Sequence, residues 1–137
     1  MTVTLTALLC FVAWTLALVL LVVGYRALLV LTFQRKADSW LRGTETDDPA
    51  FIKRAQNAHA NCLENLLLFG GVVLVAGLSG QMGELDFLAP WLLGARIMQS
   101  TVHLIAVNHW MVFMRFNFYL VQMLILVWWI LGLADLV

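Results

Sequence analysis

Residues 54–77 read RAQNAHANCLENLLLFGGVVLVAG, and this stretch decides what kind of protein the chain forms. Its first half carries an arginine, three asparagines, a histidine and a glutamate, whereas its second half is almost wholly apolar. A long apolar helix belongs in a membrane, where every polar group away from water needs a partner. The polar half therefore predicts a site or a contact inside the membrane.

The composition is that of an integral membrane protein. The chain has 137 residues, of which 63% are hydrophobic, and its mean hydropathy is +0.92. Eight basic residues balance eight acidic ones, so the chain lacks the basic surface that nucleic-acid binding requires. Cys10 and Cys62 lie in apolar stretches without metal-ligand spacing, and we interpret both as small hydrophobic side chains and expect no metal site.

Four stretches are long and apolar enough to cross the hydrocarbon core, which needs roughly 20 apolar residues. They cover about residues 4–34, 49–78, 87–107 and 111–135. The first has neither a basic start nor a small-residue cleavage site, so we expect it to remain as a membrane helix. Asp48 and Pro49 predict the N-cap and first position of the second helix. We therefore expect an all-α fold: one domain over residues 1–137, an integral membrane four-helix bundle.

Charge is distributed unequally between the connections. The second connection is acidic, with Glu84 and Asp86. The first is flanked by basic residues, namely Arg35, Lys36, Arg42, Lys53 and Arg54. The positive-inside rule then predicts that the first connection is cytoplasmic and that both termini lie outside.

Three of the predicted helices each carry one polar face. At 100° per residue, the polar residues of each helix fall within an arc of about 100°, and His59 points away from the arc of its own helix. The faces comprise Arg54, Asn57, Asn61, Glu64 and Asn65 on the second helix, Arg96, Gln99, Ser100 and His103 on the third, and Arg115, Tyr119 and Gln122 on the fourth. Because ionisable groups at membrane depth cost at least about 2.5–3.5 kcal/mol each, these faces should converge inside the bundle or at a subunit boundary.

Two interpretations of these charges stay open. Glu64 pairing with Arg96, with the amides joining the helices, would satisfy part of the polarity within the protein. Yet the four arginines in or near the spans, Arg26, Arg54, Arg96 and Arg115, face only one carboxylate, which leaves about three positive charges uncompensated unless they extend to the interface. The alternative partner is a bound anion with several negative charges and polar groups, such as a small peptide-like carboxylate.

Residues 58–65, AHANCLEN, preceded by Arg54 and followed by LLLF, resemble the signature of the family of membrane-associated proteins in eicosanoid and glutathione metabolism (MAPEG). QRKA at 34–37 and ARIMQSTVHL at 95–104 resemble the ends of its first and third helices, so the resemblance spans nearly the whole chain. It implies a homotrimer that binds glutathione between subunits near the cytoplasmic side. Glutathione carries two carboxylates and a thiol, which suits the anion that the charges require.

The resemblance also implies roles for individual residues. The residues expected to bind glutathione are Arg54, Asn57, Asn61, Glu64, Arg96, Gln99, His103 and Arg115, and those expected to be catalytic are Arg115 and Tyr119. Three departures from the family pattern stand out. Asn57 occupies a position where many members have arginine, His103 replaces a tyrosine, and the interval before Arg115 is longer than usual.

The function predicted from the resemblance is a glutathione transferase, with possible peroxidase activity, in which Arg115 favours the thiolate. A lipophilic substrate would approach from the lipid between the first and fourth helices. The short loops favour a bacterial protein similar to microsomal glutathione transferase, in the inner membrane. A non-catalytic lipid-binding regulatory protein on the same scaffold is the alternative. A transporter ranks last, because the outer halves of all four spans are apolar.

Overall fold

The computed structural model describes residues 1–41 and 46–135, and the regular secondary structure of these residues is helical. The elements in order are α1 (Val3–Leu31), the short 3₁₀ helix η1 (Ala37–Trp40), α2 (Ala50–Ser79), the single turn α3 (Met82–Leu85), α4 (Ala89–Ile105) and α5 (His109–Leu133). Arg42, counted above among the basic residues of the first connection, lies outside the described residues.

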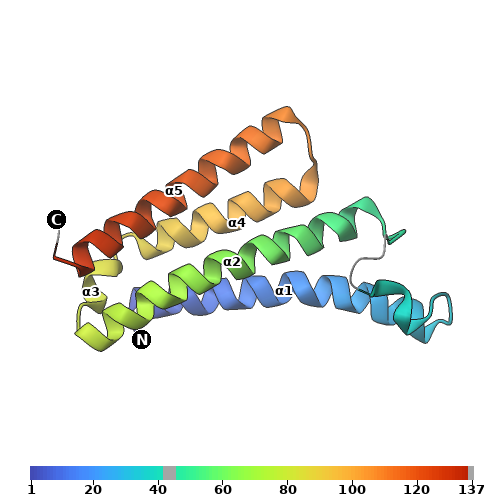
Figure 1. Ribbon diagram of the computed structural model, residues 1–137, viewed down its shortest axis with the longest axis horizontal. Helices are drawn as coiled ribbons and strands as arrows, with labels where there is room; N and C mark the ends of the chain where they lie inside the picture. Colours follow the sequence, from blue (N-terminus) through green and yellow to red (C-terminus); the bar gives the residue numbers. More distant parts are fainter. Residues whose placement is uncertain (42–45, 136–137) are drawn as a thin grey trace.

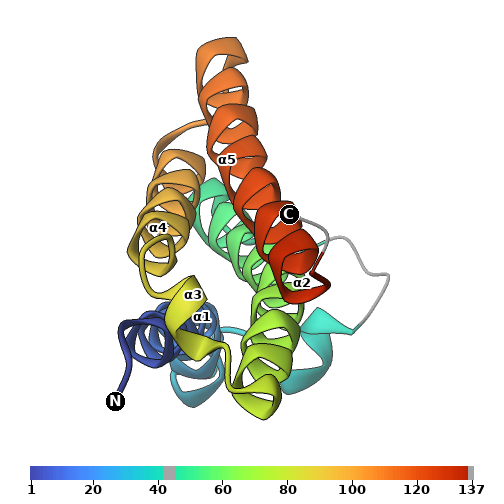
Figure 2. The same ribbon diagram turned by 90° about the vertical axis from the view of Figure 1, so that its left-hand side faces the viewer.

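The four long helices run back and forth along the long axis of the molecule (Figure 1). Both termini and α3 lie at one end, and the α1–α2 and α4–α5 connections lie at the other. Toward this second end, α5 tilts away from α2, as two perpendicular views show (Figures 1 and 2). The tilt separates the first half of α5 from the polar half of α2.

Three helices, α1, α2 and α5, are long and apolar enough to cross a membrane by length and composition. The third predicted span corresponds to α4, which has 17 residues, roughly 26 Å of helix, and is not among these three. Pro90 stands in the first turn of α4, where a missing N–H costs nothing, and the extended backbone of Ala106 ends the helix. Among the described residues, the fold is an all-helical bundle of four long helices, three of which are long and apolar enough to span a membrane.

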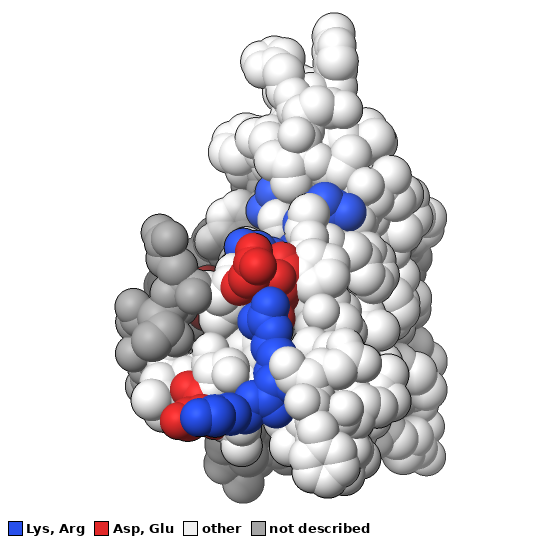
Figure 3. All heavy atoms as spheres, turned by 90° about the vertical axis from the view of Figure 1, so that its right-hand side faces the viewer, with Lys and Arg blue, Asp and Glu red and all other residues white. Residues whose placement is uncertain are grey.

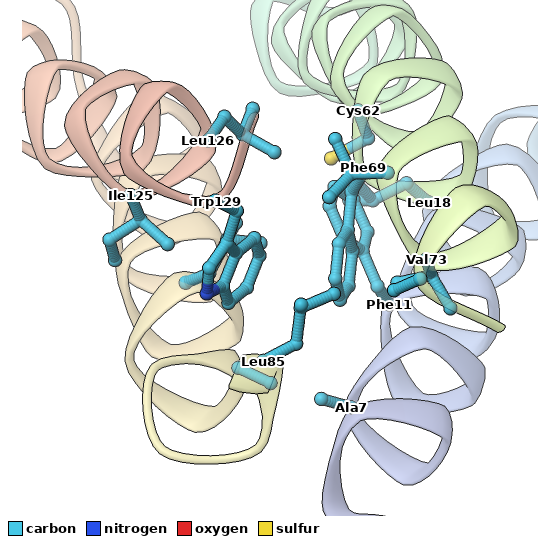
Figure 4. Close-up of a cluster of buried hydrophobic side chains, with 14 of the residues drawn as sticks. Ala7, Phe11, Leu18, Cys62, Phe69, Val73, Leu85, Ile125, Leu126 and Trp129 are labelled. Atoms are coloured by element: carbon cyan, nitrogen blue, oxygen red, sulfur yellow. The ribbon is translucent and has the colours of Figure 1, made fainter. Parts of the chain in front are cut away.

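The larger cluster of buried apolar side chains joins α1, α2, α3, α4 and α5 (Figure 4). Phe69 of α2 is fully buried between Phe11 of α1 and Trp129 of α5, with ring centroids 6.0 and 5.9 Å away. Leu85 of α3 is also fully buried and packs into this cluster. These contacts join α5 to α2 at one end only, so the other end of α5 is free to diverge.

Asp48 does not cap α2, contrary to the prediction from Asp48 and Pro49. The N-cap position is Pro49, which makes no side-chain capping bond. The Asp48 carboxylate is instead buried, accepting hydrogen bonds from the Trp40 indole at 3.0 and 3.1 Å and from the Arg26 guanidinium at 3.2 Å. Arg26 also lies 5.5 Å from the centre of the Trp40 ring. Asp48 therefore ties the end of α1 and η1 to the start of α2.

Acidic and basic side chains lie side by side at the end of the molecule that holds the α1–α2 and α4–α5 connections (Figure 3). Asp48 is one of the acidic residues of the α1–α2 connection. Burial opposes the charge of Asp48, but the hydrogen bonds from Trp40 and Arg26 outweigh it and hold the pKa of Asp48 below its ordinary value of 3.8. The charged form is thus favoured in the folded protein. Its stabilising contribution is present at neutral pH and is lost only as the pH falls through this lowered pKa.

Asp48→Asn should lower the free energy of unfolding at pH 7 by about 2 kcal/mol, because it replaces charge-assisted hydrogen bonds with weaker ones. Unfolding in detergent, followed by circular dichroism, measures the change. Asp47→Asn is the matched control, since the Asp47 side chain is fully exposed and its carboxylate lies 3.9 Å from Arg35. Equal effects of the two variants would show that the buried contacts of Asp48 contribute nothing.

Candidate functional site

A polar cavity of about 270 Å³ opens where α5 diverges from α2. Three helices line it, each with the polar face expected from the sequence. The lining residues are Asn61, Glu64 and Asn65 of α2, Gln99 of α4, and Val112, Arg115, Phe116 and Tyr119 of α5. Part of each predicted polar face therefore meets at this cavity: three residues from α2, one from α4 and two from α5.

Glu64 and Arg115 are the charged residues of the cavity. Glu64 is exposed in the single chain, and it forms no ion pair with any described residue. The Nε of Arg115 is buried and has no hydrogen-bond partner among the described residues. A carboxylate and a guanidinium on opposite walls suit a ligand that carries both a cationic and an anionic group.

The amides of the cavity are partly engaged with the protein. Asn65 donates its Nδ2 to the carbonyl oxygen of Asn61 at 3.0 Å, while its Oδ1 is buried and has no partner in the described part of the chain. Gln99 accepts a hydrogen bond from the Nε2 of Gln122 at 3.0 Å. The remaining capacity of Asn65 and Gln99 is available to a ligand.

Arg96 does not line the cavity. Its side chain is 1% exposed and its guanidinium lies 5.5 Å from the centre of the Phe11 ring on α1. Its Nε and Nη2 have no hydrogen-bond partner within residues 1–41 and 46–135. Arg96 and Glu64 form no ion pair there, so the interpretation in which they neutralise each other is wrong in the single chain. The rotation of α4 about its axis explains this difference. The polar arc of α4 is wide enough for Gln99 to face α5 while Arg96 faces α1.

Three other predicted site residues also lie outside the cavity lining. Arg54 donates its Nε to the carbonyl oxygen of Leu104 at 2.9 Å, which joins α2 to the end of α4. Asn57 is exposed, and His103 is buried with both ring nitrogens unpartnered among the described residues. The structure therefore brings together five of the predicted residues: Asn61, Glu64, Gln99, Arg115 and Tyr119.

The surplus of arginines is smaller than the sequence implied. Arg26 pairs with Asp48, which lies outside the spans and was not counted as its partner. Arg54, Arg96 and Arg115 form no ion pair among the described residues. Arg54 donates a hydrogen bond to a backbone carbonyl, and the Arg96 guanidinium lies over an aromatic ring. Of these three arginines, Arg115 is the one that lines the cavity.

Three lining residues were not among the predicted site residues: Asn65, Val112 and Phe116. Helical periodicity placed Asn65 on the polar face of the second helix, but no ligand-binding role was assigned to it. Val112 and Phe116 lie one turn apart and flank Arg115 on α5, but an apolar residue on an apolar helix carries no such signal.

An apolar groove of about 570 Å³ continues along the same α2–α5 boundary toward the termini. Leu67 and Val75 of α2 face Met123 and Ile130 of α5 across it. The groove begins about one turn beyond Glu64 and Tyr119, so the polar and apolar spaces adjoin. The expectation that the first and fourth helices form a lipophilic site is not met in the single chain, where α2 and α5 line this groove.

Together the fold and the site define an integral membrane helix bundle with an open polar cavity beside an apolar groove. A model of the MAPEG family matches residues 4–134, and the chain belongs to this family. Members are generally glutathione-dependent membrane enzymes or eicosanoid-binding proteins, and some are non-catalytic. No curated protein and no solved structure matches the chain.

Proposed function

We propose that this protein is a membrane-bound glutathione transferase, with peroxidase activity toward lipid hydroperoxides, whose cofactor site is the polar cavity. The observation that carries the proposal is Arg115, which faces this cavity without a protein carboxylate as partner among the described residues. Glutathione fits the lining because it offers two carboxylates, one ammonium group and a thiol. Those groups match a wall that carries Arg115, Glu64 and three amides.

When bound, glutathione supplies the nucleophilic sulfur. A thiol has a reference pKa of about 8.5, and a guanidinium in low dielectric stabilises the thiolate. Arg115 is placed to do this, with Tyr119 one turn later on the same wall as a hydrogen-bond donor. The adjoining apolar groove would hold a lipophilic electrophile near the sulfur.

The exposed position of Glu64 supports covering of this site by a ligand or a neighbouring subunit, as in the homotrimer that we propose. Glu64 lies about 21 Å along α2 from Ala50, well inside the span. A carboxylate facing hydrocarbon costs several kcal/mol, so a ligand or a neighbouring subunit must cover it. Binding glutathione at a subunit boundary would provide both.

The position of the cavity along the bundle agrees with the proposed orientation. Arg115 and Gln99 belong to the halves of α5 and α4 nearest their connection, which lies at the same end as the basic residues Arg35, Lys36 and Lys53. If that end is cytoplasmic, glutathione reaches the site from the compartment where it is made. We propose the bacterial inner membrane as the location and termini outside as the topology.

The apolar groove also favours a second candidate, a non-catalytic lipid-binding regulator. Its wall is formed by apolar residues of α2 and α5, which suit an acyl chain chemically. The two candidates differ in the thiol: an enzyme ionises bound glutathione, whereas a lipid-binding regulator has no need to.

Purified protein in detergent should bind glutathione, raise the ultraviolet absorbance of its thiolate, and turn over a chloronitrobenzene or a lipid hydroperoxide. Glu64→Gln should weaken glutathione binding at least tenfold, because it removes the negative partner of the ligand ammonium group. Calorimetry measures the affinity. Glu84→Gln is the matched control, since Glu84 is exposed on α3 and outside the cavity lining. Lipid binding without glutathione binding would support the regulator instead.

A further inference from the structure

Gln122 of α5 is buried directly behind the cavity wall. It is 1% exposed, and it is not among the lining residues. Its Nε2 donates two hydrogen bonds, to the carbonyl oxygen of Phe118 at 2.8 Å and to the Oε1 of Gln99 at 3.0 Å. Both hydrogens of this amide are therefore used, one within α5 and one toward α4.

These two bonds determine which end of each amide faces which way. A backbone carbonyl can only accept, so the group of Gln122 beside Phe118 must be its NH₂ and not its oxygen. An NH₂ group can only donate, so Gln99 must turn its oxygen toward Gln122. The NH₂ of Gln99 then points away from Gln122, and Gln99 lines the cavity; the hydrogen bond that its side chain makes among the described residues is the one its oxygen accepts.

We propose that Gln122 is a positioning residue that fixes the orientation of the Gln99 amide, so that Gln99 presents a hydrogen-bond donor to the ligand. This inference rests on the proposed function. It deepens that function by naming the chemistry at one point of the cavity: the part of glutathione opposite Gln99 is an acceptor, such as a carboxylate or a carbonyl. Gln122 itself does not touch the ligand.

The buried oxygen of Gln122 supports a role beyond packing. Its Oε1 has no hydrogen-bond partner in the described parts of the chain, and an unpartnered buried acceptor is destabilising. A methionine or leucine would occupy similar volume without that cost. What an apolar side chain lacks is the donor that orients Gln99.

A double-mutant cycle with Gln122→Met and Gln99→Met tests the proposal, with glutathione affinity of the detergent-solubilised protein as the readout. Gln99→Met should weaken binding roughly tenfold by removing one donor, and Gln122→Met roughly fivefold by freeing the Gln99 amide to rotate. In the Gln99→Met background, Gln122→Met should have no further effect. A merely structural role of Gln122 predicts that the two effects multiply, and that result would overturn the proposal.

Gln122→Glu gives an independent prediction. A carboxylate accepts from Gln99 and so turns the Gln99 oxygen toward the cavity, which should weaken binding more than Gln122→Met does. Equal or stronger binding by the glutamate variant contradicts the inference, and Gln122→Leu replaces the methionine variant if that variant does not fold. Failure of the wild type to bind glutathione would refute the proposed function as well, whereas normal wild-type binding with multiplying effects refutes only the role of Gln122.

Discussion

Arg115→Ala should abolish the thiolate absorbance of bound glutathione and leave the assembled protein intact. This result is expected because Arg115 is the guanidinium that lines the cavity, and its Nε has no hydrogen-bond partner within the described residues. Losing a charge that lowers the thiol pKa by even one unit reduces the thiolate fraction about tenfold at neutral pH. Turnover should fall further, by about 10²–10³, because the same charge stabilises negative charge in the transition state.

Two comparisons separate this role from a general need for positive charge. Arg54→Ala makes the same substitution on α2. The Arg54 guanidinium donates a hydrogen bond to the carbonyl oxygen of Leu104 and does not line the cavity. It should leave the thiolate absorbance unchanged. Arg115→Lys should retain part of the absorbance, since it keeps the charge without the planar donor group. An undiminished thiolate signal in Arg115→Ala would refute the assignment.

Phe69→Ala is expected to have the largest effect on stability, about 3–5 kcal/mol, because it removes a fully buried ring and leaves a cavity. Phe69 touches Phe11 of α1 and Trp129 of α5, so the loss weakens the contact that holds α5 to the rest of the bundle. Within lipid, transfer of apolar surface out of water contributes little to helix association, because the lipid itself is apolar. Close van der Waals packing of side chains such as Phe69 therefore holds the helices together. Unfolding of the purified protein by added sodium dodecyl sulfate measures the change.

Phe113→Ala is the matched control for Phe69→Ala. Phe113 lies on α5 and is 55% exposed, so its removal should change the free energy of unfolding by less than about 0.5 kcal/mol. Equal destabilisation by both variants would mean that the Phe11, Phe69 and Trp129 cluster does not hold the bundle together.

Helical periodicity was enough to predict that polar faces would line a site, but not which residues of each face would line it. Each polar arc was visible in the sequence, and the convergence of α2, α4 and α5 followed from the cost of burying polar groups. Arg96 and Gln99 share one arc, yet one meets the Phe11 ring and the other lines the cavity. Their separation depends on how α4 is rotated relative to α1 and α5, which no residue of α4 specifies alone.

Asp48 illustrates a second limit. Asp followed by Pro is typical of a helix start, and local sequence carries no sign that Trp40 and Arg26 would compete for the carboxylate. The folded chain brings the end of α1 and η1 against this carboxylate. Three charge-assisted hydrogen bonds then outweigh one capping bond.

The sequence by itself determined that the chain is a helical membrane protein with polar faces on three helices, and its motif pointed to the family. These properties follow from composition and from the angle between successive residues about one helix axis. Only the tertiary structure decided that Glu64 and Arg115 share a cavity, that Arg96 turns toward α1, and that Gln122 donates a hydrogen bond to Gln99. The tilt and rotation of each helix against its neighbours decide such contacts, and they are set by packing among residues far apart in the chain.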